Sequence, residues 1–306
     1  IWTQNNLLIR GTGKRPVMIA DGQSAEDKAT WVVRGGNVRI ENIDFRGAKA
    51  SDGNGAGIRF EKGHLSIHAC RFADNEMGVL TGNLASLSLE ISDSEFVDAP
   101  HDERDLRHLL YVGAIGRFVL RGSRFQNGYL GHLVKSRARE NHVLYNMLAD
   151  GAGGRAFFEL EFPNGGIAYV IGNVIAQSAG TDNSSVVSYG AEGPRWPVNG
   201  IYLAHNTLVN DNYTGTFLAV RDEKFPGGID VWAINNLTVG YMFPSSLLNK
   251  VKLTSLRAFA TSQNLFTLKK YSGFTPELPG DPINSGIELS AYPTTRTVAM
   301  GISIGF

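Results

Sequence analysis

Short apolar strands recur along the chain, and each is followed by a polar turn and a closing apolar residue. The closing residues are Phe45, Phe72, Phe96, Phe125, Leu148, Ile175, Leu208, Leu237 and Phe266. They lie about 23 to 33 residues apart. Each unit holds two or three short strands with glycine-rich corners and little helical periodicity. A repeat of this length and content predicts a solenoid or a propeller.

A second regularity lies two residues before the closing residue of the later units. That position is an asparagine in five successive units: Asn146, Asn173, Asn206, Asn235 and Asn264. Equivalent positions of a parallel β-coil stack about 4.8 Å apart, so inward asparagines can form a hydrogen-bonded ladder. Asparagines scattered in turns would not keep one register. The pattern therefore favours a parallel β-coil.

The second strand of each unit can be aligned in the same way, and this places ionisable residues in columns. His108 then stands beside His132. One column contains Tyr111, Lys135, Glu159 and Ser188, and the next contains Gly113, Arg137, Glu161, Gly190 and Arg221. Neighbours in a column would lie one strand spacing apart, which is close enough to act on one sugar ring. We therefore expect the segment 131–166 to carry a groove for an acidic sugar.

The coil pattern, the asparagine register and the opening segment NLLIRGTGKRPVMI together resemble the right-handed parallel β-helix superfamily, whose fold is called pectate-lyase-like. The resemblance covers about residues 5–270. It implies an all-β chain with a right-handed parallel β-helix of nine to ten coils over residues 1–266 and a C-terminal cap over 267–306. The superfamily includes polysaccharide lyases, pectin-type hydrolases, uronate epimerases and phage tailspikes, so the fold alone does not choose a function.

The overall charge of the chain narrows its partners. Lysine plus arginine equals aspartate plus glutamate, at 29 residues each, so the net charge is zero. Bulk electrostatics therefore point to neither nucleic acid nor an anionic membrane, and an acidic ligand must be held by local charges. The single cysteine, Cys70, excludes an internal disulfide. No apolar run of about 18 residues and no leader pattern is visible, so no membrane span is expected.

Cleavage of a uronate polymer by β-elimination needs a group that neutralises the carboxylate, a base that removes the C5 proton and an acid that protonates the leaving oxygen. By resemblance to the superfamily's lyases, Lys135 is the candidate base, and His132 or Tyr111 is the acid or the alternative base. Arg137 and Arg155 would hold the carboxylate. The resemblance also implies calcium, which Glu159 and Glu161 would bind.

Other polar and aromatic residues would form the walls of the groove. The candidates for substrate binding are His108, Arg155, Glu192, Arg195, Trp196 and Arg221. Glu192, Arg195 and Trp196 belong to a segment that lengthens its unit, and long loops on a rigid scaffold often bind ligands. A structural interpretation stays open for each candidate, since Lys135 beside Glu159 is equally compatible with an exposed ion pair.

The sequence therefore predicts a carbohydrate-active β-helix protein, with a polysaccharide lyase acting on an acidic polysaccharide as the leading interpretation. A glycoside hydrolase or a uronate epimerase on the same scaffold is the neighbouring alternative. A non-catalytic glycan-binding or adhesive β-helix is the alternative of a different class. The resemblance implies a periplasmic or extracellular location.

Overall fold

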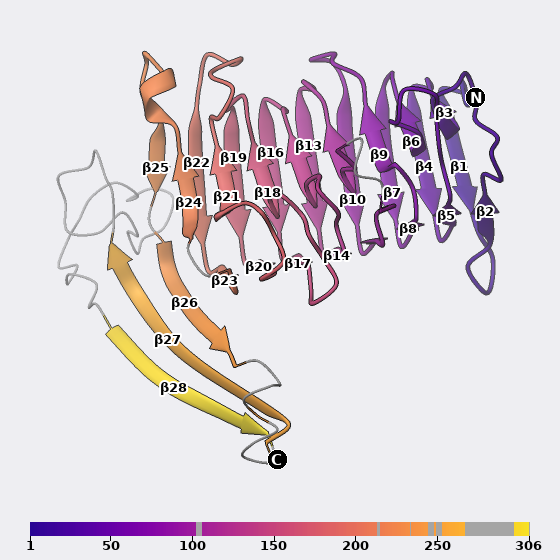
Figure 1. Ribbon diagram of the computed structural model, residues 1–306. Coiled ribbons are helices and arrows are strands. Elements are labelled where there is room, and N and C mark those ends of the chain that lie inside the picture. Colours follow the sequence, from indigo (N-terminus) through magenta and orange to yellow (C-terminus); the bar gives the residue numbers. More distant parts are fainter. Residues whose placement is uncertain are drawn as a thin grey trace.

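The computed structural model describes residues 1–101, 106–212, 215–232, 234–243, 248, 253–266 and 297–305. Over these ranges the regular secondary structure is almost wholly β-strand, and the 3₁₀ helix η1 (Asp222–Lys224) follows the last strand of one sheet. Three parallel sheets stack strand upon strand along one axis, and the chain passes from sheet to sheet to complete each turn (Figure 1). The expected all-β class and parallel β-helix architecture are confirmed.

The strands of each parallel sheet are consecutive turns of the same chain. The first sheet contains β1 (Asn6–Arg10), β4 (Asn37–Glu41), β7 (His64–His68), β10 (Ser88–Ser92), β13 (Arg117–Arg121), β16 (Glu140–Leu144), β19 (Ile167–Ile171), β22 (Gly200–Ala204) and β25 (Asp230–Trp232). The second sheet contains β2 (Val17–Ile19), β5 (Asp44–Arg46), β8 (Arg71–Ala73), β11 (Glu95–Val97), β14 (Arg124–Gln126), β17 (Met147–Ala149), β20 (Val174–Gln177) and β23 (Thr207–Asn210). The third sheet contains β3 (Ala29–Val33), β6 (Ala56–Phe60), β9 (Met77–Thr81), β12 (Leu110–Val112), β15 (Val134–Ser136), β18 (Leu160–Phe162), β21 (Ser185–Tyr189) and β24 (Thr216–Val220). The described strands therefore make about eight turns, against the nine to ten expected.

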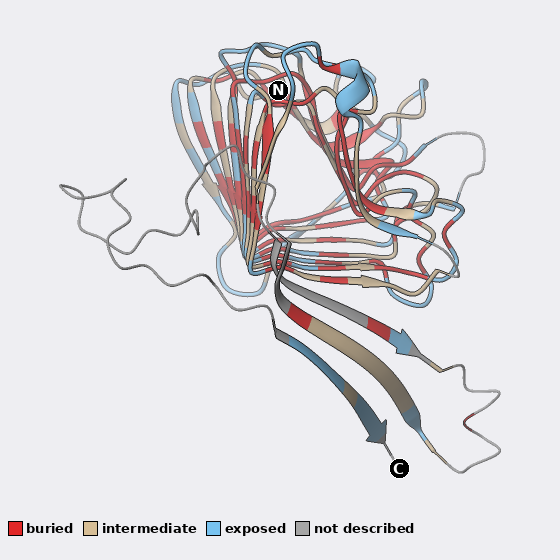
Figure 2. Cartoon of the chain, turned by 90° about the vertical axis from the view of Figure 1, so that its left-hand side faces the viewer, coloured by how far each residue is buried: buried red, intermediate tan, exposed pale blue. Residues whose placement is uncertain are grey.

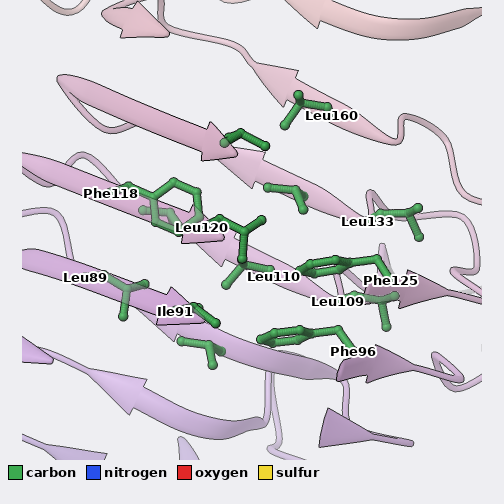
Figure 3. Packing of buried hydrophobic residues seen from close by; sticks show 14 of the residues in the cluster. Leu89, Ile91, Phe96, Leu109, Leu110, Phe118, Leu120, Phe125, Leu133 and Leu160 are labelled. Atoms are coloured by element: carbon green, nitrogen blue, oxygen red, sulfur yellow. The ribbon is translucent and has the colours of Figure 1, made fainter. Parts of the chain in front are cut away.

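The core runs along the inside of the coil, where alternate residues of every strand point inward. Figure 2 shows the buried residues on the inner sides of the three sheets. The closing residues of the first four units, Phe45 to Phe125, stack ring upon ring with centroids 5.2, 4.6 and 4.6 Å apart. Figure 3 shows two of them, Phe96 and Phe125, beside the inward leucines of the other sheets. Cys70 is also buried here as a free thiol.

The corner between the first and second sheets repeats the same backbone conformation in seven successive turns. The corner residue has a positive φ in each of them: Asn42, Ala69, Asp93, Gly122, Tyr145, Gly172 and His205. The next residue is buried in every turn, and from Ser94 to Asn206 its side chain accepts a hydrogen bond from the backbone of the preceding turn. Thus the Asn146 N–H donates to Asn173 Oδ1, and the Asn173 N–H donates to Asn206 Oδ1, each at 2.9 Å. Each turn is held to the next inside the corner.

The last described strands form a sheet of their own, and the first of them lies against β23 of the coil. They are β26 (Ile234–Met242), β27 (Ser255–Phe266) and β28 (Thr297–Gly305), which form an antiparallel sheet. Figure 1 shows this sheet extending away from the end of the solenoid. Asn235 and Asn264 belong to the antiparallel strands β26 and β27, and their side chains lie outside the described part of the structure, so the expected stack can be followed as far as Asn206. Most of the cap expected over 267–306 lies outside the described residues, and its described part is β28.

Candidate functional site

The outward face of the third sheet brings the central candidates together. Strand pairing aligns Tyr111 of β12 with Lys135 of β15, and Lys135 with Glu161 of β18. Glu161 in turn aligns with Ser188 of β21. The sequence alignment put Glu159 at this place in the column, and that is wrong by two residues. Side chains two residues apart on a strand point to the same face, so Glu159 and Glu161 fit the alternating pattern equally well. The structure has a bend at Glu159, and β18 begins only at Leu160.

Lys135 lies between two carboxylates. Its Nζ is 3.3 Å from Glu161 Oε2 and 3.5 Å from Glu192 Oε1. The same Glu161 oxygen is 3.1 Å from His132 Nδ1, a close approach without the alignment of a regular hydrogen bond. Burial acts to raise the pKa of Glu161, but the contacts with His132 and Lys135 outweigh burial and leave that pKa below its ordinary value. Glu161 is therefore a carboxylate at neutral pH.

The two histidines expected to stand together are adjacent and buried. Their ring centroids are 4.6 Å apart, and the His132 backbone N–H donates to His108 Nδ1 at 2.8 Å. This bond leaves the ring proton of neutral His108 on Nε2. Burial and then the neighbouring positive charges lower the pKa of His108 well below its usual range. Burial also lowers the pKa of His132, although Glu161 opposes it. Both imidazoles are therefore neutral at physiological pH.

Arg137 connects the column to the loops at its edge. Its Nε donates to the Tyr111 hydroxyl at 2.8 Å, and its Nη2 donates to Glu192 Oε1 at 2.8 Å. A further bond goes from Nη1 to Asn164 Oδ1. The guanidinium also lies over the Tyr111 ring, 5.7 Å from its centroid, as does the Lys135 ammonium at the same distance. The hydrogen bond from Arg137 holds the pKa of Glu192 below its ordinary value.

Glu159 faces a different environment from Glu161. Its side chain is fully buried, and neither carboxylate oxygen has a hydrogen-bond partner. Burial, and secondarily the charge of Asp150, raises the pKa of Glu159 well above its ordinary value. Asp150 itself is buried and accepts backbone N–H bonds from Gly128 and Ala156. The two side chains thus have different surroundings, although Glu159 and Glu161 are two residues apart.

The residues present do not fit the calcium site implied by the resemblance. A calcium ion takes about six to eight oxygen ligands. Glu161 is already in contact with His132 and Lys135, and Glu159 is enclosed elsewhere. No group of three or more His, Cys, Asp or Glu side chains in the described part of the chain is placed to hold a metal ion.

The remaining candidates divide between the site and its surroundings. Trp196 donates from Nε1 to the backbone oxygen of Arg137 at 3.0 Å, so its loop is fixed against the site, and Arg195 lies over the Trp196 ring. Arg155 instead pairs with Asp182 at 2.6 Å, away from Lys135. Arg221 is exposed at the end of β24, and its backbone bonds to Tyr189.

Asn164 is a contact of Arg137 that sequence reasoning did not single out. It belongs to the segment FPNGG, which begins at the last residue of β18. The available signal was its position one turn after Arg137, at the end of the same strand column. Trp196 also lines a surface hollow, together with Pro194, Val198, Asn199 and Phe225.

Comparisons with known proteins give partial matches. No protein-family model matches the chain, and no solved structure matches it. TonB-dependent receptor P3 of Formosa agariphila is 34% identical over 80 residues, which is 24% of this chain and 8% of that receptor. TonB-dependent receptor SusC of Bacteroides thetaiotaomicron is 36% identical over 73 residues, 24% of this chain and 7% of that receptor. The chain thus spans less than a tenth of the length of either relative. In the described residues, no helix is long and apolar enough to cross a membrane.

Proposed function

We propose that this protein is a carbohydrate-active β-helix protein that cleaves an acidic, uronate-containing polysaccharide by β-elimination. The observation that carries the proposal is the contact between Tyr111, Lys135 and Arg137 on one outward face, with neutral His132 beside them. Elimination requires three kinds of group: cations that neutralise the sugar carboxylate, a neutral base, and a hydroxyl that donates a proton. Such a substrate is found outside the cytoplasm, so the proposal includes a periplasmic or extracellular location.

In the proposed reaction Arg137 and Lys135 neutralise the sugar carboxylate, which makes the C5 proton acidic. The C5–H bond breaks, its electrons form the C4–C5 double bond, and the C4–O bond to the leaving sugar breaks. Tyr111 can protonate that oxygen, because its own oxygen accepts from Arg137 and its O–H remains free to donate. His132 is the base when Lys135 is a cation, and Lys135 is the alternative base, in which case Arg137 alone neutralises the carboxylate. His132 has the support of its lowered pKa, and Glu161 lies beside its Nδ1.

Hydrolysis is the second candidate, because Glu161 and Glu192 both approach Lys135 and paired carboxylates are the catalytic groups of glycosidases. A glycosidase needs one of its two carboxyl groups protonated near neutral pH, with a raised pKa. The pKa values of Glu161 and Glu192 are both lowered. This pair therefore lacks the acid, and elimination is the better supported reaction.

The test is to incubate the protein with polygalacturonate, alginate and a glycosaminoglycan while following the ultraviolet absorbance of the unsaturated uronate. We expect absorbance to rise with one polymer, and to persist in the presence of a calcium chelator. Loss of the signal on chelation would restore the calcium expectation. New reducing ends without absorbance would contradict elimination and support hydrolysis. Binding without any product would support the non-catalytic alternative.

A further inference from the structure

Glu192 stands on the solvent side of the two cations of the site. Its side chain is 44% exposed, whereas those of Lys135 and Arg137 are 13% and 18% exposed. Its two oxygens contact two nitrogens of the Arg137 guanidinium, at 2.5 and 2.8 Å, and one of them also approaches Lys135. A carboxylate held by an arginine fork with a lysine beside it is the geometry in which proteins bind carboxylate ligands.

A short turn carries Glu192 to this position. Gly190 and Gly193 flank the segment, and both have a positive φ, at 85° and 81°. The Gly193 N–H donates to the Gly190 oxygen at 3.0 Å, and the Glu192 N–H donates to the Pro163 oxygen at 2.8 Å. A Cβ on Gly193 would meet no atom within 4 Å, so the outer side of the turn is open. The turn thus has free space beside Gly193.

Glu161 provides the contrast, because its carboxylate is enclosed. Its side chain is 4% exposed, and one oxygen contacts both His132 and Lys135. Removing this carboxylate would leave Lys135 without its buried partner. Glu192 has no comparable enclosure, since its side chain is 44% exposed, and a carboxylate that water reaches is exchanged for another at a smaller cost than an enclosed one. The two carboxylates beside Lys135 therefore have different roles.

We infer that Glu192 occupies the subsite for the carboxylate of the acidic sugar and is displaced when the sugar binds. Lys135 and Arg137 are then the recognition pair, and Glu192 is an internal competitor that keeps both cations paired in the free protein. The inference rests on the proposed function, since it deepens the description of the same site. It also explains why two cations that would bind an anion are both already paired with a carboxylate.

The experiment measures the affinity of the wild type, Glu192→Gln and Glu192→Ala for glucuronate and galacturonate by calorimetry or by chemical-shift titration. Glucose is the neutral ligand, and Glu223→Gln is the matched variant, because Glu223 is an exposed glutamate of η1. We expect both Glu192 variants to bind one or both uronates about three- to tenfold more tightly than the wild type. Glucose binding and the Glu223→Gln variant should show no such gain. Thermal unfolding checks that each variant is folded.

An equal or weaker uronate affinity in both Glu192 variants would overturn the inference, and Glu192 would then be a fixed part of the site. The absence of uronate binding in every protein would overturn it as well. Failure of the proposed reaction gives a different result. If the Glu192 variants bind uronate more tightly but no protein cleaves a polymer, the inference stands and elimination fails. If the wild type cleaves a polymer and the variants show no gain in affinity, elimination stands and the inference fails.

Discussion

The outward faces of the first and third sheets use the same geometry for opposite purposes. On the first sheet, four successive turns place His142, Tyr169, Tyr202 and Trp232 in one column, with ring centroids 5.1, 5.1 and 5.9 Å apart. The rings stack on one another, so most of their faces are covered by their neighbours. This column stabilises the coil in the same way as the phenylalanines inside it.

The corresponding column of the third sheet contains unlike residues. Tyr111, Lys135, Glu161 and Ser188 follow one another, and each of the first three also contacts side chains from other columns or loops. Like residues on successive turns are what a stacked repeat favours, since they satisfy each other. The column of the third sheet departs from that rule, because its residues differ in charge and contact a histidine and a loop glutamate outside the column. In a solenoid such a departure is the better indicator of a site than aromatic content.

The sharpest way to break this comparison is Lys135→Gln, which keeps a polar side chain and removes the charge. We expect the rate of elimination to fall by about 10²- to 10⁴-fold, the usual contribution of a general base or acid, while the fold is retained. Lys62→Gln, at an exposed position, is the matched control and should keep the wild-type rate. Retention of the rate by Lys135→Gln would move the chemistry away from this column, and His132→Gln would then test the second candidate base.

The stacked core should respond in the opposite way. Phe96→Ala removes a fully buried ring between two stacked neighbours, so we expect the free energy of unfolding to fall by about 3–5 kcal/mol. Urea denaturation followed by circular dichroism measures the change. Leu84→Ala, at an exposed leucine, should change stability by less than about 0.5 kcal/mol. A small effect at Phe96 would mean that neighbouring turns fill the cavity left by the ring. It would contradict the conclusion that the stacked phenylalanines stabilise the coil.

The buried carboxyl group of Glu159 should make the stability of the protein depend on pH. Its pKa is raised in the folded protein, so above pH about 4.5 the unfolded chain loses a proton that the folded protein keeps, and stability falls as the pH rises. Glu159→Gln should therefore match the wild type at low pH and gain about 1–3 kcal/mol at higher pH. Unfolding measured from pH 4 to pH 8 checks this. A Gln variant that is less stable at every pH would show that the carboxylate has a partner. Exposed Glu90→Gln is the control.

The smallest expected effect is at the aromatic column of the first sheet. Tyr169→Ala should lower the free energy of unfolding by about 1 kcal/mol, because the rings of His142 and Tyr202 each lose the neighbour that lies between them. Its rate of polymer cleavage should equal that of the wild type. A loss of activity or of polymer binding without a loss of stability would reverse the comparison, and would assign ligand contact to the first sheet.

The repeat of apolar strands was enough to predict the parallel coil and part of the site. The segments HLLYVG and HLVKSR share a spacing that fixed two neighbour pairs, His108 with His132 and Tyr111 with Lys135. The third member of the column could not be fixed, because Glu159 and Glu161 both satisfy a period of two and only the bend before β18 separates them. The alternation of apolar and polar residues does not show where such a bend lies, because the glycine-rich corners before the strands vary in length.

Contacts made by loops were less predictable than contacts within columns. Glu192 was expected in the groove wall, but its contact with Arg137, 55 residues earlier, depends on the conformation of the turn between two glycines. Arg155 was expected at the carboxylate and instead pairs with Asp182, which belongs to another loop. At the end of the coil, the asparagine register continued into strands that pair in antiparallel fashion. An asparagine two positions before an apolar residue is compatible with both parallel and antiparallel strands. This spacing therefore could not show where the parallel coil ends.

The most direct measurement is the mass of the products released from the acidic polymer that the protein acts on. Elimination adds no water, so each cleavage leaves one fragment with an unsaturated end, lighter by one water than the corresponding hydrolysis product. The account predicts unsaturated fragments from the wild type and from the Tyr169→Ala variant, and none from Lys135→Gln. Saturated fragments, or an intact polymer with every acidic polysaccharide supplied to the folded protein, would contradict it.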